Sequence, residues 1–310
     1  MATTKTITDF ANELIEAIKT IIPDMDDAEF QVQQVKKPGN LTLTGILIRV
    51  KNLPVAPCFY IDEEYTRHLN GTPIADIASR VAANMKNSAA PASDIDISLI
   101  TDFDKAKSNI IPRLIDIRPG KNDDYLKDRV CNPMAGTQIG IIYDITLPNN
   151  VNAEMTVGVT SSLLETWNIT PDDLHELAIR NGSKLRPVYF SDMFSMLNDL
   201  SPLPFPEAEP DTTMFVLTTK NKSNGASVIL YPETIEMLHT RFPKGFWLLP
   251  SSVHEWIIVH KDLGEPDMLK EMVMAINASE VLPADQLADE VFTMDSAGNL
   301  IVAMDNAVIE

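Results

Sequence analysis

Apolar residues along the chain follow two spacings, one helical and one alternating. Residues 7–22 place apolar side chains every three or four positions, which predicts an amphipathic helix with Asp9 near its start and Pro23 after its end. In a later helix, Asn181 and Gly182 are predicted to form the end, because both accept a left-handed cap. Helical segments are predicted at residues 74–85, 103–109, 161–167, 173–185, 188–200, 232–242 and 267–277.

The alternating segments predict strands joined by tight turns. Residues 29–35 and 41–50 alternate around Pro38-Gly39-Asn40, which is typical of a β-hairpin, and residues 58–61 continue its sheet. Since strands run in hairpins with helices appended, we expect an α+β fold with mixed, mainly antiparallel sheets. Other strand-length segments lie at residues 110–117, 137–147, 153–159, 213–219, 226–231, 246–250, 254–260 and, as a closing hairpin, 291–305.

The proline-rich stretch 201–211 has four prolines in eleven positions and is predicted to be a stiff linker. It separates an N-terminal α+β region, residues 1–200, from a C-terminal α+β region, residues 212–310. We expect the two regions to pack as one globular unit. Residues 59–84 and 157–181 share the order strand, short helix, Thr-Pro and longer helix, so repeated β-α-α or β-β-α units and chance similarity both stay open.

Charge narrows the classes of partner. The 310 residues carry a net charge of −19, and residues 262–310 hold eleven acidic side chains and one lysine. Such a surface repels phosphate, so direct nucleic-acid binding is not expected. The acidic region either keeps the protein soluble or presents a negative face to a basic protein partner. No apolar run suits a membrane helix and the N-terminus resembles no secretory signal, so we expect a cytoplasmic protein without a membrane partner.

Cofactor and metal motifs are not recognisable. No glycine-rich phosphate loop occurs, and Cys58 and Cys131 are isolated, so we expect reduced thiols, no metal and no cofactor. The acidic runs Asp62-Glu63-Glu64 and Asp123-Asp124 could hold a divalent cation, although solvated turns explain them more simply.

The segment Pro250-Ser251-Ser252-Val253-His254-Glu255 supplies the residue types of a serine hydrolase. Ser251 or Ser252 would be the nucleophile, His254 the base and Glu255 the acid. If residues 253–259 form a strand, however, His254 and Glu255 point to opposite faces. The alternative is a polar turn at Pro250-Ser251-Ser252 between two core strands.

Three methionines in the predicted helix 267–277 have two interpretations. Met268, Met272 and Met274 are expected in the core, and the alternative is a groove for a partner, because methionine adapts to irregular surfaces.

The order of several blocks resembles a bacterial protein family of similar length with no established activity, found mostly in anaerobic Gram-positive gut bacteria and on their mobile elements. The matching blocks are LTLTGILI (41–48), PCFYIDEEY (57–65), residues 158–181, residues 214–238 and FWLLPSSVHEWIIV (246–259). Residues 131–145 depart from the family's pattern. Because the family has no known site, the resemblance implies no catalytic residues.

Three functions remain open on these grounds. The first is a binding or accessory protein, related to a mobile element or phage, that acts through protein contacts. The second is a hydrolase that uses Ser251 or Ser252 with His254. The third is an acidic nucleic-acid mimic that sequesters a DNA-binding protein. The oligomeric state is not predicted.

Overall fold

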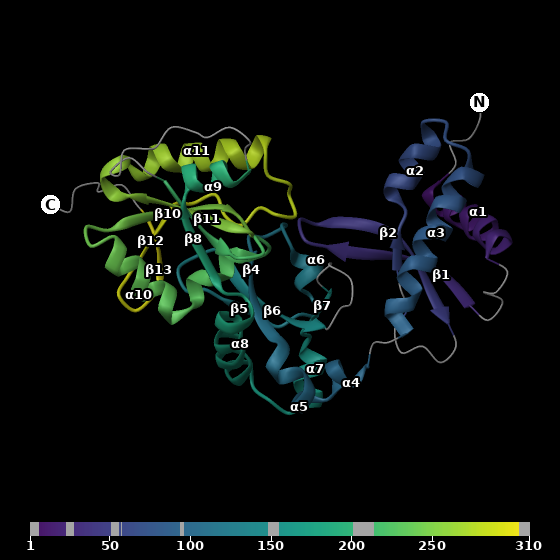
Figure 1. Cartoon of the computed structure of the whole chain (residues 1–310), viewed down its shortest axis with the longest axis horizontal. Helices are drawn as coiled ribbons and strands as arrows, with labels where there is room; N and C mark the ends of the chain where they lie inside the picture. The colour runs from purple at the N-terminus through teal and green to yellow at the C-terminus, as the bar shows by residue number, and fades with distance from the viewer. Residues whose placement is uncertain are drawn as a thin grey trace. The chain divides into compact units, whose positions relative to one another are not determined.

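The computed structural model describes residues 6–22, 28–50, 56, 58–93, 96–147, 155–200 and 214–303 (Figure 1). The chain divides into two compact units. The first unit comprises Met1–Lys37, Leu41–Leu99 and Pro148–Met155, and the second comprises Pro38–Asn40, Ile100–Leu147 and Thr156–Glu310. Within the described residues, the longest helices are too short or too polar to cross a lipid bilayer.

The first unit packs helices on a three-stranded antiparallel sheet. The sheet has the order β1-β2-β3, with strands Ala28–Lys37, Leu41–Val50 and Cys58–Tyr60. Helices α1 (Ile7–Ile21), α2 (Asp62–Leu69) and α3 (Ile74–Ser93) belong to the same unit. The fully buried Phe10, Leu14 and Ile18 of α1 join β2 and α3 side chains in one core. Asp9 completes a capping box with Thr6, which is the residue that caps α1.

The second unit contains a four-stranded sheet built around β6 (Ile139–Leu147). Strands β4 (Ile110–Asp116) and β5 (Cys131–Pro133) pair with β6 antiparallel, and β7 (Met155–Gly158) pairs with it as well. Helix α8 (Pro171–Leu185) packs on β4 and begins with a capping box between Thr170 and Asp173. Short helical segments occupy Ser98–Thr101 (α4), Phe103–Ala106 (α5), Lys107–Asn109 (η2), Asp123–Leu126 (α6) and Ser161–Trp167 (α7).

The second sheet of this unit has six strands in the order β13-β12-β10-β11-β9-β8. Helices α9 (Met193–Leu200) and α11 (Pro266–Ser279) lie side by side on the same face of this sheet (Figure 1). The other helical segments are α10 (Pro232–Arg241), η4 (Gly225–Leu230) and η5 (Lys261–Leu263). The strands are β8 (Val188–Asp192), β9 (Phe215–Thr219), β10 (Phe246–Ser252), β11 (Glu255–His260), β12 (Phe292–Met294) and β13 (Leu300–Val302).

The predicted α+β class with mainly antiparallel sheets is confirmed, because the hairpins β1–β2, β10–β11 and β12–β13 are all antiparallel. Two element predictions are wrong. Residues 188–200 form strand β8 before helix α9, since Asp192 accepts the Ser195 N–H and starts the helix there. Residues 225–230 form the 3-10 helix η4, which follows Asn224 in a left-handed conformation.

The predicted end of α8 at Asn181-Gly182 is also wrong, because the helix continues to Leu185. Gly182 is buried where α8 approaches β4 and α10, and an added Cβ would lie 2.7 Å from Tyr231 Oη. The Asn181 side chain donates to the carbonyl oxygens of Lys107 and Ile110. Both residues therefore serve packing and not termination.

The predicted linker 201–211 lies outside the described residues, as does Pro23. Strands β8 and β9, which precede and follow residues 201–211, pair with each other along their length. Both strands belong to the second unit.

Candidate functional site

The segment 250–255 forms a tight hairpin between β10 and β11. Ser252 pairs with Glu255, so the turn consists of Val253 and His254. The turn predicted at Pro250-Ser251-Ser252 therefore lies too early in the chain, because these residues belong to β10. A register shift between Pro250 and Ser252 lets the strand bend before the turn.

The two serines bond within the hairpin. The Ser252 hydroxyl accepts the backbone N–H of His254 at 3.0 Å, and the Ser251 hydroxyl donates to Glu255 Oε1 at 3.3 Å. A serine nucleophile needs its hydroxyl within hydrogen-bond reach of a base. Neither serine makes that contact with the imidazole of His254, so the residues do not form a nucleophile–base pair.

The imidazole of His254 contacts two other parts of the second unit. Its Nδ1 accepts the backbone N–H of Asn224 at 3.0 Å, and its Nε2 lies 3.4 Å from Asp285 Oδ1. Since Nδ1 is an acceptor, the proton of the neutral ring is assigned to Nε2, where it points to the carboxylate. The Thr218 hydroxyl donates to the His254 carbonyl at 2.7 Å. His254 therefore joins the hairpin to the start of η4 and to the loop after α11.

The acidic runs proposed as cation sites bond to protein groups. Asp62 accepts the Thr44 N–H at 2.9 Å, Glu63 pairs with Arg67, and Glu64 pairs with Arg80. Asp123 accepts the Gly120 N–H at 3.0 Å. Across the described part of the chain, no cluster of three or more metal-ligating side chains occurs.

The isolated cysteines are free thiols. Cys58 and Cys131 are both half-buried, and burial raises the pKa of each thiol. A raised pKa keeps a thiol protonated and weakly nucleophilic near neutral pH.

A buried ion cluster joins β4 and β6 of the four-stranded sheet. Asp144 of β6 is fully buried and bonds Arg113 Nη1 at 2.7 Å and Arg129 Nη1 at 2.9 Å. Burial alone would raise the pKa of Asp144, but the two guanidinium groups outweigh it and hold the pKa below its usual value. The guanidinium of Arg129 also lies over the Tyr125 ring, 4.3 Å from its centroid.

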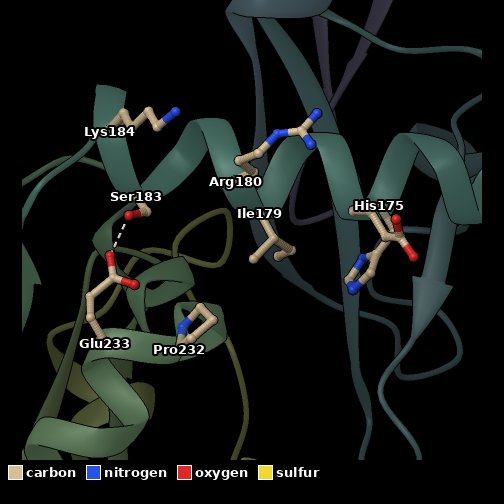
Figure 2. Close-up of a pocket in the computed structure, with 8 residues that line it drawn as sticks. His175, Ile179, Arg180, Ser183, Lys184, Pro232 and Glu233 are labelled. Carbon is tan, nitrogen blue, oxygen red and sulfur yellow. Dashed lines mark hydrogen bonds between the residues drawn. The ribbon is translucent and has the colours of Figure 1, made fainter.

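A groove between α8 and α10 has a volume of about 500 Å³ and a mixed charged lining. Figure 2 shows Arg180 and Lys184 pointing to one side of α8, whereas Ser183 turns to Glu233 and bonds it. His175 Nδ1 and the Tyr143 hydroxyl share a hydrogen bond of 3.0 Å. The lining holds both cations, Arg180 and Lys184, and carboxylates, Glu176 and Glu233, so it favours neither sign of ligand.

A smaller pocket lies between α9, α11 and the face of the six-stranded sheet. Its volume is about 250 Å³ and its lining is almost entirely apolar. We call it the methionine pocket. It is lined by Met193, Met214, Leu249, Pro250, Ser251, Ile257, Met272, Val273, Ile276 and Asn277. Ser251 is therefore a candidate residue that does reach a cavity, although its hydroxyl is bonded to Glu255.

An exposed apolar ridge of α11 borders the methionine pocket. Met268, Met272 and Ile276 are spaced by four residues and so share one flank of the helix. Met268 is 70% exposed, Met274 is 48% exposed and Ile276 is 43% exposed. The prediction that Met268 and Met274 lie in the core is wrong, because Leu269, Val273 and Asn277 form the buried face of α11. Met272 alone of the three packs partly against the core.

Sequence reasoning missed most of the methionine pocket. The methionines of residues 267–277 pointed to it, because a partner groove was the alternative to a core role. Met193 and Met214 carried no such signal, since they reach the pocket only through the pairing of β8 with β9.

Comparison with known proteins identifies a family of unknown function. No curated protein and no solved structure matches the chain. A family model described as a family of unknown function, DUF5688, matches residues 7–296. That match covers nearly the whole chain, both compact units included. The chain therefore belongs to the DUF5688 family of unknown function.

Proposed function

We propose that the protein acts by binding another protein through the methionine pocket and the α11 ridge, defined here as Met268, Met272 and Ile276. The observation that carries this proposal is the exposure of large apolar side chains beside an open apolar pocket. Exposing such side chains to water is unfavourable, and contiguous apolar surface of this kind is typical of interaction sites. Methionine suits such a surface because its flexible thioether adapts to different partners.

Hydrolysis has less support than binding. The imidazole of His254 bonds Asn224 and faces Asp285, and both serines bond elsewhere in the hairpin. A nucleophilic mechanism would need one of these serines to leave its bond and rotate to the ring.

Site-specific photo-cross-linking tests the proposed function. A photoreactive residue in place of Met268 should capture a protein in lysate of the source organism, and mass spectrometry would identify it. Leu185 is a matched control, because it is a 43% exposed apolar residue at the end of α8, outside the ridge and the pocket. Capture of the same proteins at both positions, or of none at Met268, would count against binding through α11.

A nucleic-acid mimic is a special case of this function. If the captured partner binds DNA, added duplex DNA should compete with the protein for it. Absence of competition would contradict the nucleic-acid mimic hypothesis but would not contradict protein binding through the α11 ridge.

A further inference from the structure

The chemistry around the α11 ridge narrows the partner. We infer that the methionine pocket takes one large apolar side chain of a basic, amphipathic α-helix on a partner protein, and that this helix lies along α11. This inference rests on the proposed function and names the partner's chemistry.

The size of the pocket favours a single anchoring side chain. Its volume of about 250 Å³ falls below the roughly 300–1,000 Å³ of pockets that enclose whole small-molecule ligands. Protein interfaces place one aromatic or aliphatic anchor in a pocket of this kind and surround it with weaker contacts. Ser251 is the polar group of β10 in the lining, and its hydroxyl is already bonded to Glu255.

The position of the pocket favours a helix over a strand. The pocket lies on the face of the six-stranded sheet, between α9 and α11, whereas the sheet's edges are β8 and β13. An added strand would need one of those edges. The α11 ridge instead offers side chains at positions i, i+4 and i+8, a row into which the side-chain rows of another helix can pack.

The charge around the ridge selects a basic helix. Glu265, Asp267 and Glu271 are exposed around the first turns of α11, and Lys270 is already paired with Glu290 at 2.7 Å. Glu255 adds a carboxylate next to Ser251 at the pocket. A second copy of this chain would bring the same carboxylates together, so like-charge repulsion disfavours self-association through this surface.

Fluorescence anisotropy with labelled synthetic peptides tests the inference. The probe is a helical peptide of about 18 residues made of leucine and lysine with one central tryptophan. Matched peptides replace tryptophan by alanine, or every lysine by glutamate. We expect the first peptide to bind, the alanine peptide to bind at least about tenfold more weakly, and the glutamate peptide not to bind. Added salt should weaken the binding.

Protein variants locate the binding. Met268→Lys and Met272→Lys should each lower the affinity for the lysine peptide about tenfold or more. Leu185→Lys adds the same charge elsewhere and should leave that affinity unchanged. Met268 is 70% exposed, so its variant keeps the inference testable if Met272→Lys unfolds.

Several results would overturn the inference. Equal affinity for the lysine and glutamate peptides would do so, as would full affinity in both methionine variants. Binding that appears only after removal of residues 304–310 would assign the pocket to the chain's own C-terminal residues. If no peptide binds but the Met268 cross-link captures a protein, the basic-helix inference is wrong and the proposed protein binding stands. If neither experiment detects binding, the proposed function is wrong too.

Discussion

At the residue scale, the clearest case is Asp144, one carboxylate shared by two arginines. Asp144 lies within the predicted strand 137–147, but its partners could not be read from the sequence, because Arg113 and Arg129 come from β4 and from the loop before β5. A buried ion cluster contributes little net stability when complete, yet removal of one partner leaves a charge buried without compensation.

We expect Asp144→Asn to lower the free energy of unfolding by about 3–5 kcal/mol at neutral pH, measured by urea denaturation. Because the pKa of Asp144 is lowered in the folded protein, its contribution is present above the unfolded pKa of about 4 and is lost as pH falls through the folded pKa. The gap between the two proteins should therefore close in acid. Asp104→Asn is the control, since Asp104 is exposed and pairs with Lys107, three residues later in the chain. An equal loss in both variants would contradict the role of burial.

Tyr231 gives a second pH dependence of stability, at alkaline pH. Burial raises the pKa of Tyr231 to about 12. A raised pKa stabilises the folded protein fully below the unfolded pKa of about 10, and that contribution is lost as pH rises towards 12. We expect this residue to account for a loss of roughly 2 kcal/mol in unfolding free energy by about pH 12. Urea titrations of the protein and of Tyr231→Phe would measure it. The same alkaline fall in both proteins would show that other groups cause it.

At the element scale, the sequence predicted helices and hairpins correctly where spacing and turn residues determine the structure. It failed where contacts with residues far along the chain determine it. Alternation around Pro38-Gly39-Asn40 gave the β1–β2 hairpin, since both spacing and turn residues agree. The predicted helix at residues 188–200 was half wrong, because β8 is held by pairing with β9 more than twenty residues later. A polar turn at Pro250-Ser251-Ser252 between two strands was predicted, but these residues extend β10 and the turn lies at Val253 and His254.

At Gly182, tertiary packing outweighs helix propensity. Alanine should favour the interior of α8 by about 1 kcal/mol on propensity alone. The added Cβ would however lie 2.7 Å from Tyr231 Oη and 2.8 Å from Pro112 Cδ. We therefore expect Gly182→Ala to be destabilising by about 1–3 kcal/mol in thermal or urea unfolding. Glu176→Ala, at an exposed position of the same helix, should be nearly neutral. Stabilisation by Gly182→Ala would show that the neighbours yield.

At the scale of the whole molecule, two compact units share one chain with a single family match. The first unit has its own buried core, which contains Phe10. Only proximity in space defines such units, so their bounds could not be read from the sequence, and the predicted linker 201–211 lies outside the described residues. The net charge of −19 could be read from the composition, but the exposure of Met268 and Met274 among the acidic residues of α11 could not.

We expect Phe10→Ala to destabilise the first unit by about 3–5 kcal/mol. Hydrogen exchange should then lose protection in α1 and α3 while β10 and β11 keep theirs, because the core around Phe10 contains only residues of the first unit. Leu69→Ala, which truncates an exposed side chain of that unit, is the control. A uniform loss of protection across both units would show that the chain unfolds as one cooperative body.

The methionine pocket has a chemical consequence beyond shape. Met193, Met214, Met272 and the exposed Met268 bring four thioethers to one surface. Peroxide converts a thioether to a sulfoxide, which is polar and hydrogen-bonds to water. If the protein binds a partner through this surface, as proposed above, that binding would weaken under oxidative stress and recover when a sulfoxide reductase restores the sulfur. For a chain with this surface, loss of reducing conditions would act as a release signal.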